Sequence, residues 1–499
     1  MGEVVVPIED DGSMHVLPLY SPPTTTPLEI ITVKSTWIKD TPVAGQAGSG
    51  PPDVVDLREL ESWLPLTESR NGTIFSAVFH LLCSGLGFQA LLLPAAFSSL
   101  GWTWGIICLS IAYTWQLYTA WLLVNLHEPV PGTRCSRFVR LSIIAFGQKL
   151  GKLLAIFPVM YLSGGSCVML IITGGNSMKQ FFNIICEQGT MCGSKSLSGT
   201  HWFLIFTCVA LIIGQLPNLN SIARVSLTGA ITSIGYITMI SALSIGKGRT
   251  DGVSYNVPDA EKTGMARFGD ISNAIGIIML AFRGHNLILE IQGTLPSESK
   301  HSCRTSMWRG VMVSYIIIPM CLFPLAVVGF WAYGDKIPAK GVGILTAFAQ
   351  FREHDTSKFM IGLIYLWLAI ACITSYQIYA MPAFDNLEFV YASNKKRRCP
   401  GWVRVGLRLF FGGLTLLIAV AFPFLGSLAP LIGGLAAVPL TFAYPCFMWI
   451  SIRKPGRNSG MWSVNMGLGC FGIILSILLI VAAVWNLADQ GLNANFFSP

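Results

Sequence analysis

Long apolar runs separated by short polar stretches dominate the chain from residue 73 onward. A helical run of about 20 apolar residues spans the hydrocarbon core of a membrane. Eleven runs of roughly this kind are present, at 73–97, 102–126, 153–185, 201–216, 222–246, 271–295, 308–333, 359–383, 404–425, 428–450 and 462–486. The pattern predicts an all-α integral membrane protein with about eleven transmembrane helices.

Glycine interrupts the first and the sixth of these runs at matching places. The first run carries Ser84-Gly85-Leu86-Gly87 in its middle, and the sixth carries Arg283-Gly284-His285-Asn286. Unwound backbone within a bilayer is tolerated only where it lines an enclosed or watery cavity. Glycines in one such helix would be explained by close helix packing alone. Two breaks placed five segments apart instead favour the binding site of a transporter.

Broken helices offer complementary partners for a zwitterion. The N-terminus of a half-helix exposes N–H groups that favour a carboxylate, and the C-terminus exposes carbonyls that favour an ammonium group. We expect the N–H groups of 84–87 to bind a carboxylate and the carbonyls of 282–284 to bind an amine. Other polar or aromatic side chains could reach the same cavity. The candidate substrate-binding residues are Ser84, Gly85, Leu86, Gly87, Phe282, Arg283, Gly284, His285, Asn286, Tyr161 and Ser375.

Four ionisable residues lie deep in the apolar runs, where a charge is expensive and indicates function. Arg283 stays charged at ordinary pH, so it cannot carry a proton. It could pair with a substrate carboxylate or with Glu290, or it could face an aqueous vestibule. His80, His285 and Glu290 can carry protons, although each could equally be a hydrogen-bonded structural group. These three residues are the candidates for coupling transport to a proton, and no cofactor other than a proton as coupling ion is expected.

Composition and charge exclude several classes of protein. Hydrophobic residues make up 53% of the chain and charged residues 12%, against roughly 25% charged in soluble domains, which argues against a soluble multidomain enzyme. The net charge of +8 does not indicate nucleic-acid binding, because the positive charge follows the loops. If the N-terminal tail is cytoplasmic, the inside loops hold 18 Lys and Arg and the outside loops nine. This excess agrees with the positive-inside rule, and the odd number of predicted segments then places the C-terminus outside.

The segments outside the apolar runs are short, except at the N-terminus. Residues 1–71 hold 11 acids and runs such as SPPTTTP, and they are predicted to form a disordered cytoplasmic tail. A transmembrane domain over 72–486 and a short outside tail over 487–499 follow. The 134–152 loop is expected to form a short helix on the inner leaflet, since Phe138, Leu141, Ile144 and Ala145 share one helical face.

The 13 cysteines are scattered, with no spacing typical of a metal site. Cys186 and Cys192 fall in a predicted outside loop, where a disulfide could form. No nucleophile–base pair lies in the apolar runs, so we do not expect an enzyme. No nucleic-acid partner and no obligate protein partner are indicated; the expected partners are an amino acid substrate and the lipid bilayer.

Several longer stretches resemble the plant amino acid/auxin permease family of the APC superfamily, in its lysine histidine transporter-like branch. The matching stretches are LPAAFSSLGW (93–102), LPNLNS (216–221), GHNLILEIQGTLPS (284–297), MWRGVMVSY (307–315), SYQIYAMPAFDNLE (375–388) and YPCFMWISIRKP (444–455). The runs SWLPLTESR (62–70) and NANFFSP (493–499) resemble one subgroup of that branch.

The resemblance implies a LeuT-type fold in which helices 1 and 6 are broken. Its 5+5 inverted repeats would cover about 73–246 and 271–450, and 462–486 would be an extra helix. It also implies proton-coupled import of amino acids across the plasma membrane by alternating access. Importers of this family carry a small residue before Gly-His-Asn, whereas this chain has Arg283. A carrier of another small carboxylate, such as an auxin-like acid, and a transport-dead amino acid sensor remain the alternatives.

Overall fold

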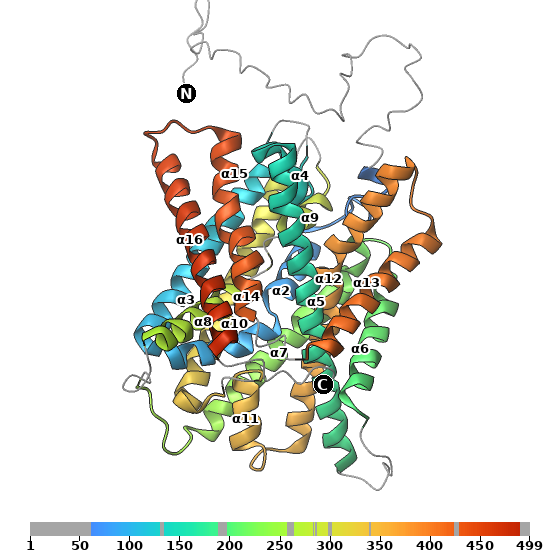
Figure 1. Cartoon of the computed structure of the whole chain (residues 1–499). Helices are drawn as coiled ribbons and strands as arrows, with labels where there is room; N and C mark the ends of the chain where they lie inside the picture. The colour runs from blue at the N-terminus through green and yellow to red at the C-terminus, as the bar shows by residue number, and fades with distance from the viewer. Residues whose placement is uncertain are drawn as a thin grey trace, which may run out of the picture. The chain divides into compact units, whose positions relative to one another are not determined.

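The protein is described by a computed structural model over residues 61–129, 134–187, 197–256, 264–282, 284, 287–297, 302–338, 341–423 and 429–489. These residues belong to one unit, Pro52–Pro499. All regular secondary structure in them is helical (Figure 1). The principal helices are α2 (Ile74–Gly85), α3 (Leu93–Leu126), α4 (Phe138–Phe146), α5 (Gln148–Glu187), α6 (Gly199–Ile213), α7 (Ala223–Lys247), α8 (Gly264–Ala281), α9 (Ile288–Gly293), α10 (Cys303–Tyr333), α11 (Ile344–Arg352), α12 (Lys358–Lys395), α13 (Gly401–Ala421), α14 (Ala429–Ile432), α15 (Tyr444–Arg453) and α16 (Gly460–Asp489).

The predicted all-α membrane architecture is confirmed. Every apolar run identified in the sequence overlaps one of these helices or a consecutive group of them. Within the described ranges, eight helical stretches are long and apolar enough to cross a membrane, and α6 is a shorter apolar helix. The full number of membrane crossings and the two inverted repeats stay predictions.

Both predicted helix breaks are present. The helix α2 ends at Gly85, and a short 3-10 helix, η1 (Phe88–Leu92), leads into α3. In the second half of the chain, α8 ends at Ala281 and α9 begins at Ile288. A further bend lies within α3 at Gly101, whose φ of 72° is a conformation that glycine adopts without steric cost. This bend separates the first predicted run from the second.

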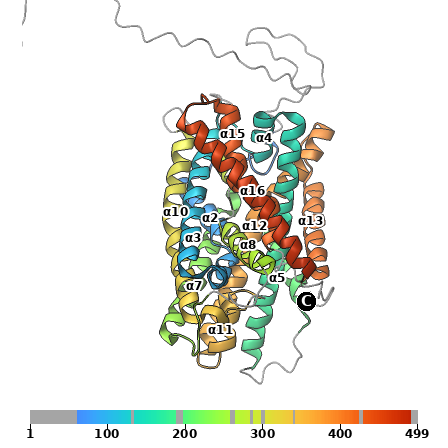
Figure 2. The ribbon, with the colours of Figure 1, turned by 60° about the vertical axis from the view of Figure 1, so that its left-hand side comes forward.

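The broken helices pack inside the bundle. The helix α2 lies against α7, α10 and α12, while α3 lies against α8 and α10, and α12 packs along α5 and α7. The two views in Figures 1 and 2 place α4 and α15 at one end of the bundle and α11 at the other. Figure 2 also shows α16 lying across α8, with which it makes contact. Both breaks are therefore enclosed by helices.

The tenth predicted run is less regular than its hydropathy suggests. It is divided into α14, two widened π-helical turns, η6 (Gly433–Ala437) and η7 (Pro439–Ala443), and α15. Pro439 has no N–H to donate within a helix, and such turns leave carbonyls that need other partners. The Ser476 hydroxyl on α16 donates to the carbonyl of Gly434 at 2.6 Å. The extra helix thus completes the hydrogen bonding of the irregular one.

The N-terminal tail is corrected at its membrane end. Residues 61–71 were predicted to be disordered, but from Glu61 onward the chain packs against the α4 end of the bundle. Leu64 and Leu66 are buried there, and Glu61 and Glu68 pair with arginines of the membrane domain. Two apolar anchors and two ion-paired acids explain why this stretch is ordered. The rest of the predicted tail, up to residue 60, lies outside the described residues.

Candidate functional site

The two helix breaks face each other. Ser84, at the end of α2, is 2% exposed. A Cβ atom placed on Gly284 would lie 3.3 Å from the Ser84 hydroxyl oxygen, so the backbones of the two breaks are close neighbours. Gly284 has a φ of +119°, a backbone conformation that residues other than glycine rarely adopt. The structure thus brings together Ser84 and Gly284, which are 200 residues apart in the chain.

Hydrogen bonds from α12 hold the first break in place. The Tyr379 hydroxyl donates to the carbonyl of Ser84 at 2.7 Å, and the Ser375 hydroxyl donates to the carbonyl of Cys83 at 3.1 Å. These carbonyls are among the last four of α2, which have no partner within the helix. Ser375 was a predicted site residue, whereas Tyr379 was not. Its spacing of four residues from Ser375, on the same helical face, is the signal that could have found it.

The second break is held by a side chain of α3. Gln116 donates its amide N–H to the carbonyl of Phe282, a residue predicted to bind the amine of a substrate. A carbonyl oxygen has two lone pairs, so Phe282 keeps the capacity to accept a second hydrogen bond. In the first break, the N–H of Leu86 donates to the carbonyl of Leu82 at 2.8 Å. The N–H of Leu86 is therefore not available to a carboxylate.

The other predicted residues are placed differently. The His80 ring is fully buried on α2, and its Nδ1 lies 2.7 Å from the Ser226 hydroxyl on α7. Tyr161 lies in a groove on α5 together with Lys149 and Lys152. Arg283, His285 and Asn286 lie outside the described residues.

Cys186 forms a disulfide bond, but Cys192 lies outside the described residues, so this pairing stays a prediction.

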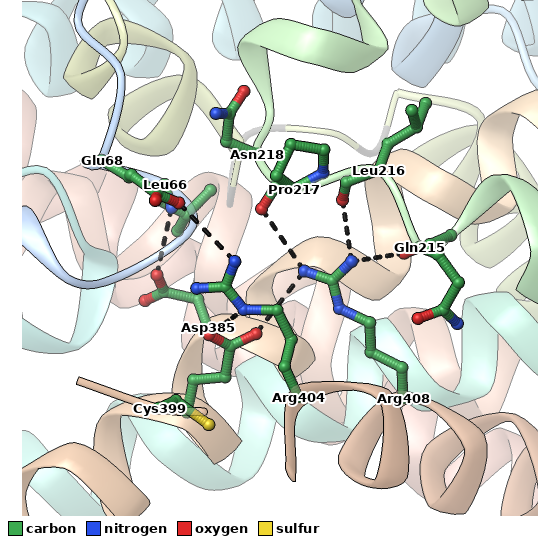
Figure 3. Close-up of polar contacts among 12 residues, drawn as sticks. Leu66, Glu68, Gln215, Leu216, Pro217, Asn218, Asp385, Cys399, Arg404 and Arg408 are labelled. Carbon is green, nitrogen blue, oxygen red and sulfur yellow. Dashed lines mark hydrogen bonds and ion pairs between the residues drawn. The ribbon is translucent and has the colours of Figure 1, made fainter. Parts of the chain in front are cut away.

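A cluster of charged side chains joins α4, α12, α13 and the 61–70 segment. Figure 3 shows the part of it around Asp385, Arg404 and Arg408. Arg137, the residue before α4, donates from Nε to Asp385 at 2.6 Å and from its NH2 to the other Asp385 oxygen at 3.2 Å. The backbone N–H of Leu66 donates to the same carboxylate at 3.3 Å. Asp385 on α12 thus fastens both α4 and the N-terminal segment.

The same N-terminal segment reaches α13 through a second chain of ion pairs. Glu68 pairs with Arg398 and lies 3.7 Å from Arg404. Arg404 donates to Glu388 at 3.0 Å, and Glu388 also pairs with the buried Arg408. Figure 3 shows Arg408 pointing at the α6–α7 connection, where it donates to the carbonyls of Gly214 and Leu216. The cluster therefore ties five parts of the chain together: the 61–70 segment, α4, α12, α13 and the α6–α7 connection.

Electrostatics favour the charged form of the cluster. Burial alone would lower the pKa of Arg137, but the neighbouring Asp385 and Glu61 carboxylates outweigh it and raise that pKa. The ion pair of Arg137 with Asp385 is also bidentate, because a guanidinium can make two parallel hydrogen bonds to one carboxylate. Arg137 is thus a permanent cation held between two acids.

Glu290 joins this cluster and not the helix breaks. It lies on α9, is 3% exposed, and one of its carboxylate oxygens has no hydrogen-bond partner among the described residues. The backbone of Phe138 hydrogen-bonds to Glu290, and Arg137 and Asp385 are close enough to act on it electrostatically. The acid of the second broken helix therefore lies beside the ion pairs at the α4 end of the bundle.

Comparison with known proteins identifies the family. A family model described as "Transmembrane amino acid transporter protein" matches residues 70–488, which include both breaks and the α4, α12 and α13 side of the charged cluster. The chain belongs to this family. It is therefore an amino acid transporter that crosses the membrane several times, and not an enzyme.

Two Arabidopsis thaliana relatives are similar over most of their length. Lysine histidine transporter-like 7 is 50% identical over 462 residues, which cover 92% of this chain and 93% of that protein. Lysine histidine transporter-like 8 is 48% identical over 443 residues, covering 89% of this chain and 84% of the relative. The resemblance of the chain to this branch of transporters is thereby confirmed.

A solved structure gives the fold. The substrate-bound, outward-open structure of a Na+-coupled sialic acid symporter aligns with a TM-score of 0.52 at 12% sequence identity, covering 87% of this transporter and 93% of that chain. At this identity the likeness concerns the fold alone. It confirms the expected LeuT-type architecture.

Proposed function

We propose that this amino acid transporter is a proton-coupled importer that works by alternating access at the plasma membrane. The observation that carries the proposal is the contact of the two broken helices at Ser84 and Gly284. Half-helix ends that meet inside a bundle present N–H and carbonyl groups to one ligand, which suits the two charged ends of an amino acid.

The charged cluster supplies the inner gate in this proposal. Asp385 and Glu388 hold the cytoplasmic ends of α4, α12 and α13 together with the 61–70 segment. A path from the site to the cytoplasm requires these ends to separate, so the ion pairs must break in each transport cycle. Buried ion pairs are suited to this role because their attraction and their desolvation largely offset each other.

Glu290 is the group we assign to coupling. It lies on the half-helix that begins after the second break, and its charge acts on Arg137 and Asp385. Binding one proton changes the charge of the cluster by one unit, and loss of that proton to the cytoplasm restores it. His80, which is buried against Ser226, is the alternative carrier. A carrier at His80 would act on α7 and not on the charged cluster.

The substrates we expect are neutral and acidic amino acids. Arg283 precedes Gly284 at the second break, and a like charge about 6 Å away at an effective dielectric near 20 costs roughly 3 kcal/mol. This is enough for about a hundredfold preference over basic substrates. The same cation would also suit a small organic carboxylate such as an auxin-like acid.

The experiment is uptake by cells that express the full chain. Twenty amino acids and indole-3-acetate compete against labelled alanine, at two outside pH values and with sodium present or replaced. Inward current that rises as the outside pH falls, without sodium, supports the proposal. Strict sodium dependence contradicts proton coupling. The absence of any substrate-dependent current at normal surface expression favours the sensor.

Selectivity and orientation are measured in the same cells. Arg283→Ala should improve lysine transport relative to alanine, and an unchanged ratio would place the arginine away from the substrate.

Reporters fused before Met1 and after Pro499 should lie inside and outside, respectively. Both reporters on one side would contradict eleven membrane crossings.

A further inference from the structure

A groove of about 720 Å³ runs along the first half of α5. Its lining residues recur every three or four positions, so they share one face of the helix. The two residues at its start are basic, and those beyond them are apolar or aromatic. They are Lys149, Lys152, Leu153, Ile156, Phe157, Met160 and Tyr161.

The groove begins at one edge of the membrane. The helix α5 starts beside α4, at the end of the bundle where α15 ends (Figure 1), and charge distribution predicts that this end is cytoplasmic. From Lys149 to Tyr161 a helix advances about 18 Å, at 1.5 Å per residue. Half of the hydrocarbon core is about 15 Å thick. The groove thus extends from the inner membrane surface to about the bilayer centre.

The apolar part of the groove faces outward. Leu153 is 68% exposed and Phe157 is 53% exposed, which would be unfavourable in water but is expected against lipid chains. The rings of Phe157 and Tyr161 stack at a centroid separation of 5.7 Å and form the far part of the lining. The surface is therefore shaped for a hydrocarbon chain that lies along α5.

The two lysines at the basic end of the groove lack an acidic partner within the described part of the chain. Lys149 and Lys152 are exposed, and neither forms an ion pair with an acid among the residues that the structure describes. This contrasts with the nearby Arg137 and Arg140, both of which pair with acids. Two ammonium groups one helical turn apart, with no ion-paired acid among the described residues, are therefore available to a ligand at the level of the lipid headgroups.

We propose that the groove binds one anionic phospholipid of the inner leaflet. Its headgroup lies between Lys149 and Lys152, and an acyl chain follows Leu153, Ile156 and Phe157 toward the bilayer centre. A phospholipid joins an anion to a hydrocarbon chain, as the groove joins two cations to an apolar surface. Each lysine near an anionic lipid surface contributes about fivefold in affinity. The proposal is independent of the substrate and of the coupling ion.

The test is native mass spectrometry of the purified full chain with phosphatidylglycerol or phosphatidylcholine added. The wild type should retain phosphatidylglycerol in preference to phosphatidylcholine. The double variant Lys149→Gln, Lys152→Gln should lose that preference by more than tenfold. The matched control is Arg304→Gln, Arg309→Gln, which removes the same charge from exposed positions at the start of α10 and should retain the preference.

A third variant distinguishes binding of the lipid in the apolar groove from its attraction by surface charge alone. Ile156→Trp fills the apolar part and leaves both lysines, so it should reduce retention of phosphatidylglycerol severalfold. Size-exclusion profiles and helical content establish that each variant is folded. Equal losses in the lysine variant and in its arginine control, or full retention by Ile156→Trp, would show that only surface charge attracts the lipid and would overturn the proposal.

Discussion

At the scale of single residues, the site depends on backbone geometry that few side chains permit. Gly284 combines a φ of +119° with an approach to Ser84 that leaves 3.3 Å for a Cβ atom. A non-glycine residue in such a conformation costs about 1–3 kcal/mol, and the added contact requires Ser84 to shift. The break thus depends on this glycine for two separate reasons.

Replacing Gly284 should therefore impair transport more than it impairs folding. We expect Gly284→Ala to reduce uptake of alanine at least tenfold per transporter at the cell surface. The control is Gly413→Ala on α13, where an added Cβ meets nothing within 4 Å and uptake should stay near normal. Equal uptake by the two variants would mean that the second break tolerates ordinary backbone geometry.

Tyr379 offers a second comparison between matched side chains. Its hydroxyl donates to the carbonyl of Ser84, whereas the Tyr376 hydroxyl, on the same helix, contacts Thr415 on α13. A hydrogen bond of this kind contributes about 1 kcal/mol net. Tyr379→Phe should lower uptake about fivefold, and Tyr376→Phe should change it by less than twofold. A larger effect at Tyr376 would show that α12 acts through its packing on α13.

At the scale of helices, the glycine pattern of the sequence located the helix breaks, but it did not identify the polar side chains that hold them. Both breaks could be located from Ser84–Gly87 and Gly284, because unwinding within a bilayer is a local property of the backbone. Gln116 and Tyr379 could not be found in this way, since their partners lie 166 and 295 residues away. The π-helical turns before α15 were missed for a similar reason, as they depend on a hydroxyl from α16.

The charged cluster also escaped prediction, although its residues are plain in the sequence. Basic residues in loops were explained by topology, and the acids of the 61–70 segment were assigned to a disordered tail. Only packing shows that Arg137 and Leu66 share the carboxylate of Asp385. Charge counts therefore predict sidedness, but they do not predict which charges are buried and paired.

Asp385 is the residue whose removal should open this end of the bundle. Loss of one partner from a buried pair costs about 3–5 kcal/mol, and the remaining contact of Arg137 with Glu61 reduces that cost. Asp385→Asn should therefore favour separation of α4 from α12. Cys135, which is buried beside this cluster, should then react faster with a thiol reagent applied from the cytoplasmic side.

Labelling of the Cys135 peptide is measured by mass spectrometry in membranes that are open on that side. Asp251→Asn is the control, since this exposed acid lies in the loop after α7 and away from the cluster. Labelling that stays at the level of the control would show that the ion pairs do not hold this end closed.

At the scale of the whole molecule, one short helix links the second helix break to the charged cluster that we propose as the inner gate. The helix α9 begins after the second break and carries Glu290 to the charged cluster. Movement of the break on substrate binding would therefore move an acid relative to Arg137 and Asp385. This gives a physical route by which substrate, proton and gate influence one another.

The pH dependence of uptake tests that route. With a proton carrier at Glu290, Glu290→Gln removes the titrating group, so uptake should no longer rise as the outside pH falls from neutral to acid. His80→Asn should leave the pH dependence in place, because its hydrogen bond to Ser226 lies away from the cluster. Glu353→Gln, at an exposed acid before α12, controls for the loss of one negative charge. A pH profile that is normal in Glu290→Gln but flat in His80→Asn would transfer the coupling role to the histidine on α2.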